Sequence, residues 1–273
     1  MQECFHNKFG WDTATFHNID WDESETEYHR LSPGRRLASF KLQNCLWPTN
    51  KILHQRKKIP SPLCSQCTQH PETHNHVLRY EHAQQTRLQL WNKVTTVLTT
   101  TLKTPTPLQD ALEFGICSWQ EGDTDIHWPF RFPAGVDPID DAIFIAFRYQ
   151  TIIGWSQALC GHLSSQWGQA MALFMHHRHP HQTFQPANWT RTVMRSLREY
   201  SYSQWTERNS HIYGIDQAAS QALHRHALQK KITEAYNNIP SIPGDEQPFT
   251  FDTPPTTRLL QSTTLLWAWL LQY

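Results

Sequence analysis

The sequence is poor in glycine and in charge, and these shortages exclude several classes of protein. Only 10 of the 273 residues are glycine, which disfavours glycine-rich nucleotide-binding folds and barrels with many tight turns. Charged residues make up 18% and apolar residues 38%, both below the usual shares of about 25% and about 45–50%. The 24 basic and 24 acidic side chains cancel, which argues against a bulk nucleic-acid coater and against an acidic tail protein.

Signals for secretion and for membrane insertion are also missing. The first residues lack the apolar segment of a secretory signal. The longest apolar run, Leu265 to Leu271, is far shorter than the roughly 20 residues that cross a bilayer. We therefore expect a soluble intracellular protein, in the nucleus or cytoplasm, with no membrane partner and with its six cysteines reduced.

Histidine and tryptophan are abundant, with 17 and 12 copies, and the apolar residues recur at helical spacing. Ser32-Pro33 and Asp137-Pro138 each have a capping side chain followed by proline, a pattern typical of a helix start. Further apolar stripes predict helices at about 86–102, 164–177, 188–210 and 216–236. The fold class expected is mainly α: a small Cys/His zinc-knuckle-like segment followed by an irregular helical bundle.

Proline, glycine and charge divide the chain into five expected parts. These are an acidic irregular N-terminal arm (1–30), basic helices with a zinc-binding-like segment at 62–82 (31–116), a linker loop (117–136), a helical domain (137–239), and a Pro-rich loop with a C-terminal amphipathic helix (240–273). That last helix is a candidate for dimerisation or partner docking.

The zero net charge hides a zoned pattern. Residues 28–71 carry eight basic side chains and no acidic one, whereas residues 1–27 carry seven acids against Lys8 alone. A stretch of this kind predicts a phosphate-contact surface, unless the acidic segments balance it in three dimensions. The candidate nucleic-acid-binding residues are Arg35, Arg36, Lys41, Lys51, Arg56, Lys57 and Lys58.

One segment has the residue types and spacing of a metal site. Cys64 and Cys67 are separated by two residues, so that two thiolates from one turn can reach the same ion. His76 and His82 follow at distances that would complete a Cys2His2 zinc site, and His70 and His74 are competing ligands. The alternative is a coincidental cluster in a histidine-rich chain.

Other chemistries fit the sequence poorly. No thioredoxin-like unit precedes the Cys pair, and no zinc-deaminase signature, glycine-rich phosphate loop or nucleophile elbow occurs. Asp137, Asp140 and Asp141 suggest a weak Mg2+ nuclease alternative, although Asp137 is better explained as a helix cap.

The order of these motifs resembles a known family. Residues 36–80 contain Leu-Trp-Pro-Thr, a basic turn, Cys-x2-Cys, Glu-Thr and His-Val-Leu in that order. Residues 149–167 and 205–214 add Gln-x-Ile-Ile-Gly-Trp and Trp-x-x-Arg-Asn-x-x-Ile-x-Gly. Together they resemble the C-terminal region, downstream of the polymerase, of LINE-type non-LTR retrotransposon polyproteins: a zinc-binding-like segment followed by a helical extension.

The resemblance implies a non-catalytic tail that engages RNA or DNA beside a reverse transcriptase supplied in trans, with Zn2+ as cofactor. The family usually has Cys as the fourth ligand, where this chain has Tyr80. A phenol is a poor zinc ligand, so His82 replaces it or the site is weakened or lost. Trp47 could stack on a base, although a place in the core suits it better.

Two interpretations remain open from the sequence. One is a nucleic-acid-binding module without enzymatic activity. The other is a helical protein–protein interaction scaffold, or a truncated retroelement relic, in which Leu266, Trp267, Leu270 and Leu271 form a docking face.

Overall fold

The computed structural model describes residues 2–79, 84–129, 137–214, 217–238, 251 and 253–272. Every regular element in these ranges is helical, and extended pairing there is limited to two isolated β-bridges. The prediction of a mainly α protein is therefore confirmed. The chain divides into two compact units, Met1–Trp205 and Thr206–Tyr273, and each is described by itself.

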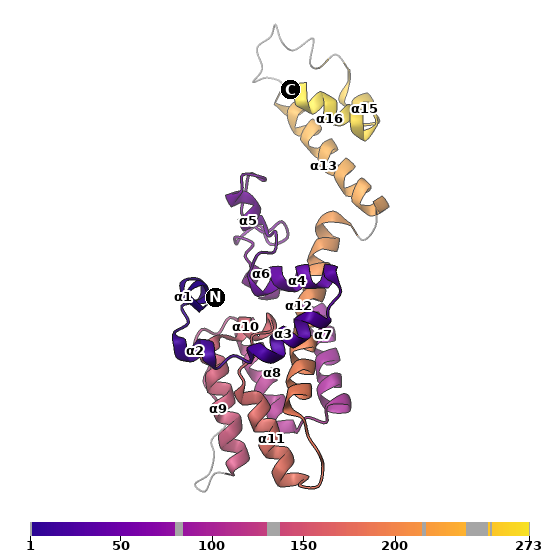
Figure 1. Cartoon of the computed structure of the whole chain (residues 1–273). Helices are drawn as coiled ribbons and strands as arrows, with labels where there is room; N and C mark the ends of the chain where they lie inside the picture. Colours follow the sequence, from indigo (N-terminus) through magenta and orange to yellow (C-terminus); the bar gives the residue numbers. More distant parts are fainter. Residues whose placement is uncertain are drawn as a thin grey trace. The chain divides into compact units, whose positions relative to one another are not determined.

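The N-terminal part of the first unit is helical (Figure 1). Its elements are α1 (Gln2–Phe9), α2 (Thr13–His17), α3 (Trp21–Arg30) and α4 (Pro33–Gln43). The expectation of an irregular arm over residues 1–30 is therefore wrong. The carboxylates of Asp12 and Asp20 explain the difference, because they accept hydrogen bonds from the N–H groups of Thr15 and Glu23 and cap α2 and α3.

Two very short helices follow α4 and flank the Cys/His segment. They are α5 (Asn50–Gln55) and α6 (His74–Arg79). Trp47, at the entry to α5, is 2% exposed, and its indole stacks on that of Trp205 with ring centroids 4.8 Å apart. Trp47 is therefore a core residue, which is the place that the sequence favoured over stacking on a base.

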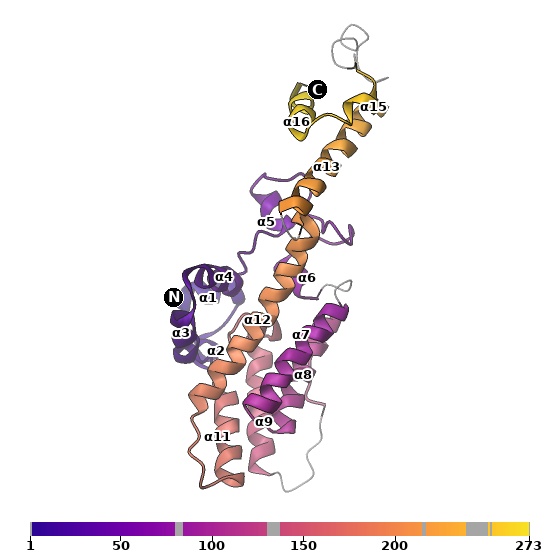
Figure 2. The same ribbon diagram turned by 90° about the vertical axis from the view of Figure 1, so that its right-hand side faces the viewer.

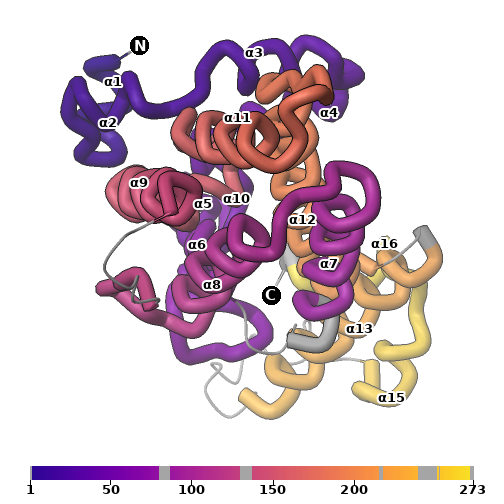
Figure 3. The backbone as a smooth tube through the Cα atoms, turned by 90° about the horizontal axis from the view of Figure 1, so that it is seen from below, coloured from indigo at the N-terminus to yellow at the C-terminus, as the bar shows by residue number. Residues whose placement is uncertain are grey.

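A helical bundle forms most of the first unit. Its elements are α7 (Gln84–Thr96) with a π-helical end η2 (Val97–Thr101), α8 (Thr106–Glu121), α9 (Pro138–Ile153), α10 (Trp155–Leu159), α11 (Gln166–Arg178) and α12 (Pro186–Tyr213), the last continuing into the second unit. Figure 3 shows α9 packed against both α11 and α8. Trp167, Trp189 and Phe147 lie fully buried in this core.

The expected linker loop at 117–136 takes a different form. Residues 117–121 belong to α8, which ends at Glu121 and is followed by Gly122 with φ at 107°, a left-handed conformation that favours glycine. Residues 130–136 lie outside the described residues. The helix predicted to start at Asp137-Pro138 is present, with the Asp137 carboxylate accepting the N–H of Ile139 at 3.0 Å.

The second unit has a small core of its own. After the end of α12 it contains α13 (Gln217–Asn237), α15 (Pro255–Arg258) and α16 (Thr263–Gln272), and Figure 2 shows α15 and α16 beside α13. Leu228, Ile232 and Leu266 are buried together there. No helix among the described residues is long and apolar enough to cross a membrane.

Candidate metal centre

The loop between α5 and α6 folds into a tight knuckle. Leu63 and Pro71 form an isolated antiparallel bridge, and the N–H of Cys64 donates to the carbonyl of His70 at 2.8 Å. The N–H of Thr68 then donates to the carbonyl of Cys64 at 2.9 Å, with Thr68 at φ 55°. Closing the loop in this way turns Cys64 and Cys67 toward the same point.

Three of the four predicted ligands come together there. One ligand atom each from Cys64, Cys67 and His76 lies within 4.8 Å of the other two, and Cys67 Sγ is 3.6 Å from His76 Nε2. Zinc–sulfur and zinc–nitrogen bonds of about 2.3 and 2.0 Å in a tetrahedron place such atoms roughly 3.5 Å apart. The group can therefore hold a metal ion, and its soft thiolate and imidazole donors are compatible with zinc.

The pKa values of the two thiols, Cys64 and Cys67, shift in opposite directions. Burial raises the pKa of Cys64. Burial acts upward on Cys67 as well, but hydrogen bonds from the backbone N–H groups of Gln69 and His70 outweigh it, and the pKa of Cys67 is lowered. Cys67 is thus the thiol that loses its proton more readily, as a metal ligand must.

The competing histidines take other places. The His70 ring is exposed, with its centroid 6.2 Å from that of His76. His74 is buried and faces away from the knuckle: its Nε2 lies 3.4 Å from Cys160 Sγ, and its ring packs on Trp47. His82, the predicted fourth ligand, and Tyr80 lie outside the described residues.

A buried glutamate, which is not among the candidates predicted from the sequence, links the knuckle to α5. Glu72 is 1% exposed, and its Oε2 accepts the N–H of Asn50 at 2.7 Å, at the start of α5. The N–H of Lys51 donates to the Glu72 carbonyl at 3.2 Å, and the Asn50 amide donates to the carbonyl of Leu63 at 2.7 Å. A carboxylate at a helix N-terminus satisfies a free N–H group and complements the helix dipole. The sequence signal was present, since Glu72 is the first acid after 44 residues without one.

The acidic and basic zones pair selectively. Glu23 and Glu27 of the acidic N-terminal zone pair with Arg191 and Arg195 of α12, at 2.8 and 2.6 Å. Balance in three dimensions therefore applies to Arg191 and Arg195 of α12. Within the described residues it does not extend to Lys51, Arg56, Lys57 or Lys58, which are exposed and outside any ion pair.

The three basic candidates on α4 are placed apart from this group. Arg35 lies 3.2 Å from the Glu199 carboxylate, with its guanidinium 4.0 Å from the Tyr202 ring centroid. Arg36 donates to the backbone carbonyls of Leu31 and His29. Lys41 is half-buried. Thus the structure gathers the candidates of residues 51–58 on one segment and gives Arg35 and Arg36 intramolecular partners.

The acids of the nuclease alternative form no comparable centre. Asp137 caps α9, and within the described part of the chain the Cys64, Cys67 and His76 group is the one set of three such ligands close enough to share an ion.

Comparison of the chain with models of protein families, with curated proteins and with solved structures found no match in any of the three.

Proposed function

We propose that this chain is a non-catalytic nucleic-acid-binding module, in which Zn2+ held by Cys64, Cys67 and His76 orders a basic segment for contact with RNA or DNA phosphates. The observation that carries the proposal is the Glu72 link between the knuckle and α5. Through it, order at the metal ligands is transmitted to the helix where Lys51 begins the exposed basic run.

Zinc would act here as a structural ion. Two thiolates and one imidazole are a common part of closed four-ligand zinc sites, and His82 is the candidate for the fourth position. The ion would hold the two ends of the knuckle together, and no chemical step is assigned to it. A structural zinc ion of this kind agrees with the resemblance to the tail of retrotransposon polyproteins. The reverse transcriptase of such a system would act in trans.

Four exposed cations set the expected strength of binding. If Lys51, Arg56, Lys57 and Lys58 each neutralise one phosphate, the logarithm of the binding constant should fall with the logarithm of salt concentration with a slope of about −3.6 for duplex DNA and about −2.8 for a single strand. Binding should therefore be weak at physiological salt and should depend little on sequence.

The test is a salt titration of nucleic-acid binding. We expect labelled RNA and DNA oligonucleotides to bind the full chain, followed by fluorescence anisotropy, with the slopes given above. The double variant Lys57→Glu/Lys58→Glu should reduce the slope by about 2 and weaken binding at every salt concentration.

A matched control is available in the second unit. Lys230 and Lys231 are also adjacent and exposed, on α13, so Lys230→Glu/Lys231→Glu changes the net charge by the same amount. Equal loss of affinity in both double variants would show general charge attraction and would contradict a site on residues 51–58. Absence of binding in the wild type at low salt would remove the proposal altogether.

The scaffold interpretation has one observation in its favour. On α16, Leu265 and Trp267 are 55% and 46% exposed, whereas Leu266 is buried in the core of the second unit and so does not belong to the docking face that the sequence suggested. A concentration-dependent dimer in sedimentation equilibrium, abolished by Trp267→Glu, together with no affinity for nucleic acid, would favour this alternative.

A further inference from the structure

Outside the Cys/His knuckle, two cysteines of the first unit have their thiols in contact. Cys45 lies in the connection between α4 and α5, and Cys160 caps the C-terminal end of α10. Both are free thiols, and the Cys160 thiol donates a hydrogen bond to Cys45 Sγ. Cys160 is wholly buried, whereas Cys45 is half-buried, so solvent and small solutes reach the pair through Cys45.

His74 gives the hydrogen bonds of this pair a direction. Its Nε2 lies 3.4 Å from Cys160 Sγ. A thiol has one proton, and that of Cys160 goes to Cys45, so the bond between His74 and Cys160 needs a proton on Nε2. His74 then donates to Cys160 and Cys160 donates to Cys45, which places the last accepting sulfur at the half-buried end.

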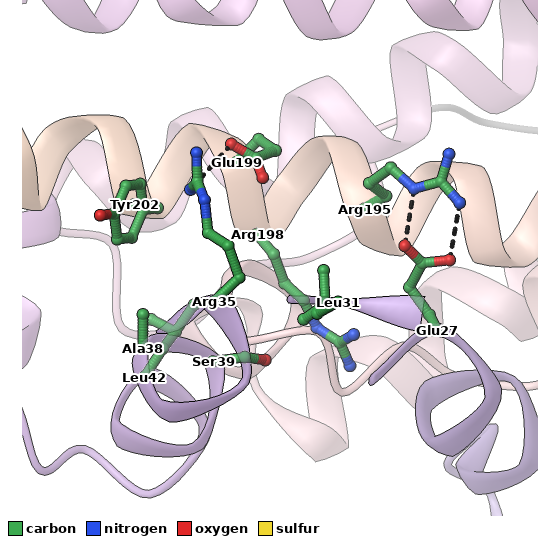
Figure 4. Close-up of a pocket in the computed structure, with 10 residues that line it drawn as sticks. All are labelled: Glu27, Leu31, Arg35, Ala38, Ser39, Leu42, Arg195, Arg198, Glu199 and Tyr202. Carbon is green, nitrogen blue, oxygen red and sulfur yellow. Dashed lines mark hydrogen bonds and ion pairs between the residues drawn. The ribbon is translucent and has the colours of Figure 1, made fainter. Parts of the chain in front are cut away.

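Two positive charges act on the pair. Lys8 of α1 donates a hydrogen bond to the carbonyl of Asn44, next to Cys45. Arg198 of α12 is 6% exposed, and Figure 4 shows its side chain extending from α12 toward α3 and α4. Lys8 favours the thiolate of Cys45, and both cations favour the thiolate of Cys160. The surroundings are therefore electropositive, as they are around reactive cysteines.

The pKa shifts of the two thiols distinguish their roles. The hydrogen bond from Cys160 and the charge of Lys8 lower the pKa of Cys45, although burial opposes them. Donation of the same hydrogen bond, together with burial, raises the pKa of Cys160 well above its usual range. Cys45 is therefore the thiol that reacts first as a thiolate, and Cys160 is the thiol beside it that can react with the product.

The backbone holds Cys45 in a conformation that few side chains adopt. Its φ is 48°, in the left-handed region that favours glycine, and residues held there recur at functional sites. A disulfide needs its two sulfurs at about 2.05 Å. Because Cys45 lies in a connection rather than in a helix, its sulfur can close on Cys160 by a local shift of that connection.

We propose that Cys45 and Cys160 form a redox-active pair, which hydrogen peroxide converts into a disulfide. The Cys45 sulfur attacks one peroxide oxygen, the O–O bond breaks, and Cys45 becomes a sulfenic acid while the other oxygen leaves as water. Cys160 Sγ then attacks Cys45 Sγ, the S–O bond breaks, and that oxygen leaves as a second water with the Cys160 proton. The two thiols lose two electrons and two protons, and the peroxide is reduced. The proposal is independent of zinc and of nucleic-acid binding.

Two other cysteines provide internal controls. Cys4 is exposed, so it would react first if exposure alone governed the rate. Cys117 is half-buried, as Cys45 is, but burial and the charges of Glu113 and Glu121 raise its pKa to about 11. It should therefore stay reduced under conditions that oxidise Cys45.

The test is a peptide map of the dilute full-length protein, kept in Zn2+ and treated with limited hydrogen peroxide. After alkylation and trypsin digestion, mass spectrometry should find peptides 42–51 and 149–178 joined by a disulfide. We expect this link to form about tenfold or more faster than Cys4 is oxidised. Dithiothreitol should separate the two peptides.

Two variants assign the steps. In Cys160→Ser the second thiol is missing, so a Cys45 sulfenic acid should accumulate and be trapped by dimedone. The Cys117→Ser protein should form the disulfide as the wild type does. If Cys160→Ser does not fold, the wild-type peptide map still decides the question.

Three outcomes would overturn the proposal. These are no linked peptides in the wild type at a peroxide concentration that oxidises Cys4, a Cys45 rate no greater than that of Cys4, or no dimedone adduct at Cys45 in a folded Cys160→Ser protein.

Discussion

Among single side chains, His162 illustrates how burial fixes a protonation state. It is 1% exposed, and its ring meets those of Trp11 and Trp21 at 5.5 and 5.4 Å. Its Nδ1 lies 3.0 Å from the side-chain oxygen of Gln157. Burial, with a further contribution from the positive charge of Arg198, lowers the pKa of His162 to about 3, so the folded protein holds the ring neutral.

This protonation state predicts acid sensitivity. Above pH 6.5, the ordinary pKa, the ring is neutral whether or not the chain is folded. As pH falls from 6.5 toward 3, His162 binds a proton in the unfolded chain but stays neutral in the folded chain, so the free energy of unfolding falls. The loss from His162 should be about 2.5 kcal/mol between pH 7 and pH 4.5.

Urea unfolding at these two pH values checks the expectation. His162→Phe keeps an aromatic ring and removes the titrating group, so its free energy of unfolding should fall less between pH 7 and pH 4.5 than that of the wild type. His181→Gln, at an exposed position, should match the wild type. An equal fall in wild type and His162→Phe would show that His162 does not carry the effect.

At this scale, spacing alone identified part of the candidate site. Cys64 and Cys67 are two residues apart and His76 is nearby in sequence, so a local turn suffices to gather them. Spacing could not show that His76 lies with the cysteines whereas His74 does not. His74 turns to Cys160, 86 residues away, and such a contact exists only once the bundle has formed.

Among the elements, the close approach of α8 and α10 depends on one glycine. A Cβ at Gly115 would overlap the indole of Trp155, so the two helices approach at the one residue that has no side chain. The same ring packs against Phe147 of α9, with centroids 5.0 Å apart. Gly115 therefore sets the distance between helices in the middle of the bundle.

Replacing Gly115 by alanine should destabilise the protein, although alanine favours a helix more than glycine does. Alanine is the better helix former by up to about 1 kcal/mol, yet Gly115→Ala should lower the free energy of unfolding by about 1–3 kcal/mol because it overpacks the core. Gly34→Ala on α4, where a Cβ would meet nothing within 4 Å, should be neutral or slightly stabilising. Urea unfolding of the two variants provides the comparison, and a Gly115→Ala protein as stable as the wild type would contradict it.

Helix positions were largely readable from the sequence, because caps and apolar stripes are local. Pro33 and Pro138 stand at the first helical positions, as predicted. The helices before residue 31 were missed, because their apolar residues are few and spread over short turns. They are held by contacts to distant residues, such as the hydrogen bond of 3.0 Å from the Trp11 indole to the Ile153 carbonyl.

For the molecule as a whole, the candidate metal site and the main hydrophobic core are built from different residues. The core of the first unit is centred on large side chains of the bundle, such as Trp167 and Leu112, whereas the ligands lie in the loop before α6 and at its third residue. Loss of the ion should therefore disturb the knuckle and α5 more than the bundle.

Removal of zinc should separate folding from binding. After chelation, or in Cys64→Ser, we expect most of the helical circular dichroism signal to remain while nucleic-acid affinity falls, because α5 loses its ordered support. Both quantities are measured on the same sample, and added zinc should restore affinity to the chelated wild type but not to the variant. Loss of most helical signal on chelation would contradict the separation, and unchanged affinity would contradict a role for zinc.

The sequence by itself determined the helical class, most helix starts and the spacing of the Cys pair, since all of these depend on neighbours within a few residues. Only the tertiary structure decided which charges remain unpaired. Glu23 and Glu27 reach Arg191 and Arg195 across 168 residues, and this pairing leaves Lys51 to Lys58 to solvent. It also decided that Arg198 is buried without a full set of hydrogen-bond partners among the described residues, because that depends on how α3 and α4 pack against α12. Burial and long-range pairing are properties of the packed chain, and no local pattern specifies them.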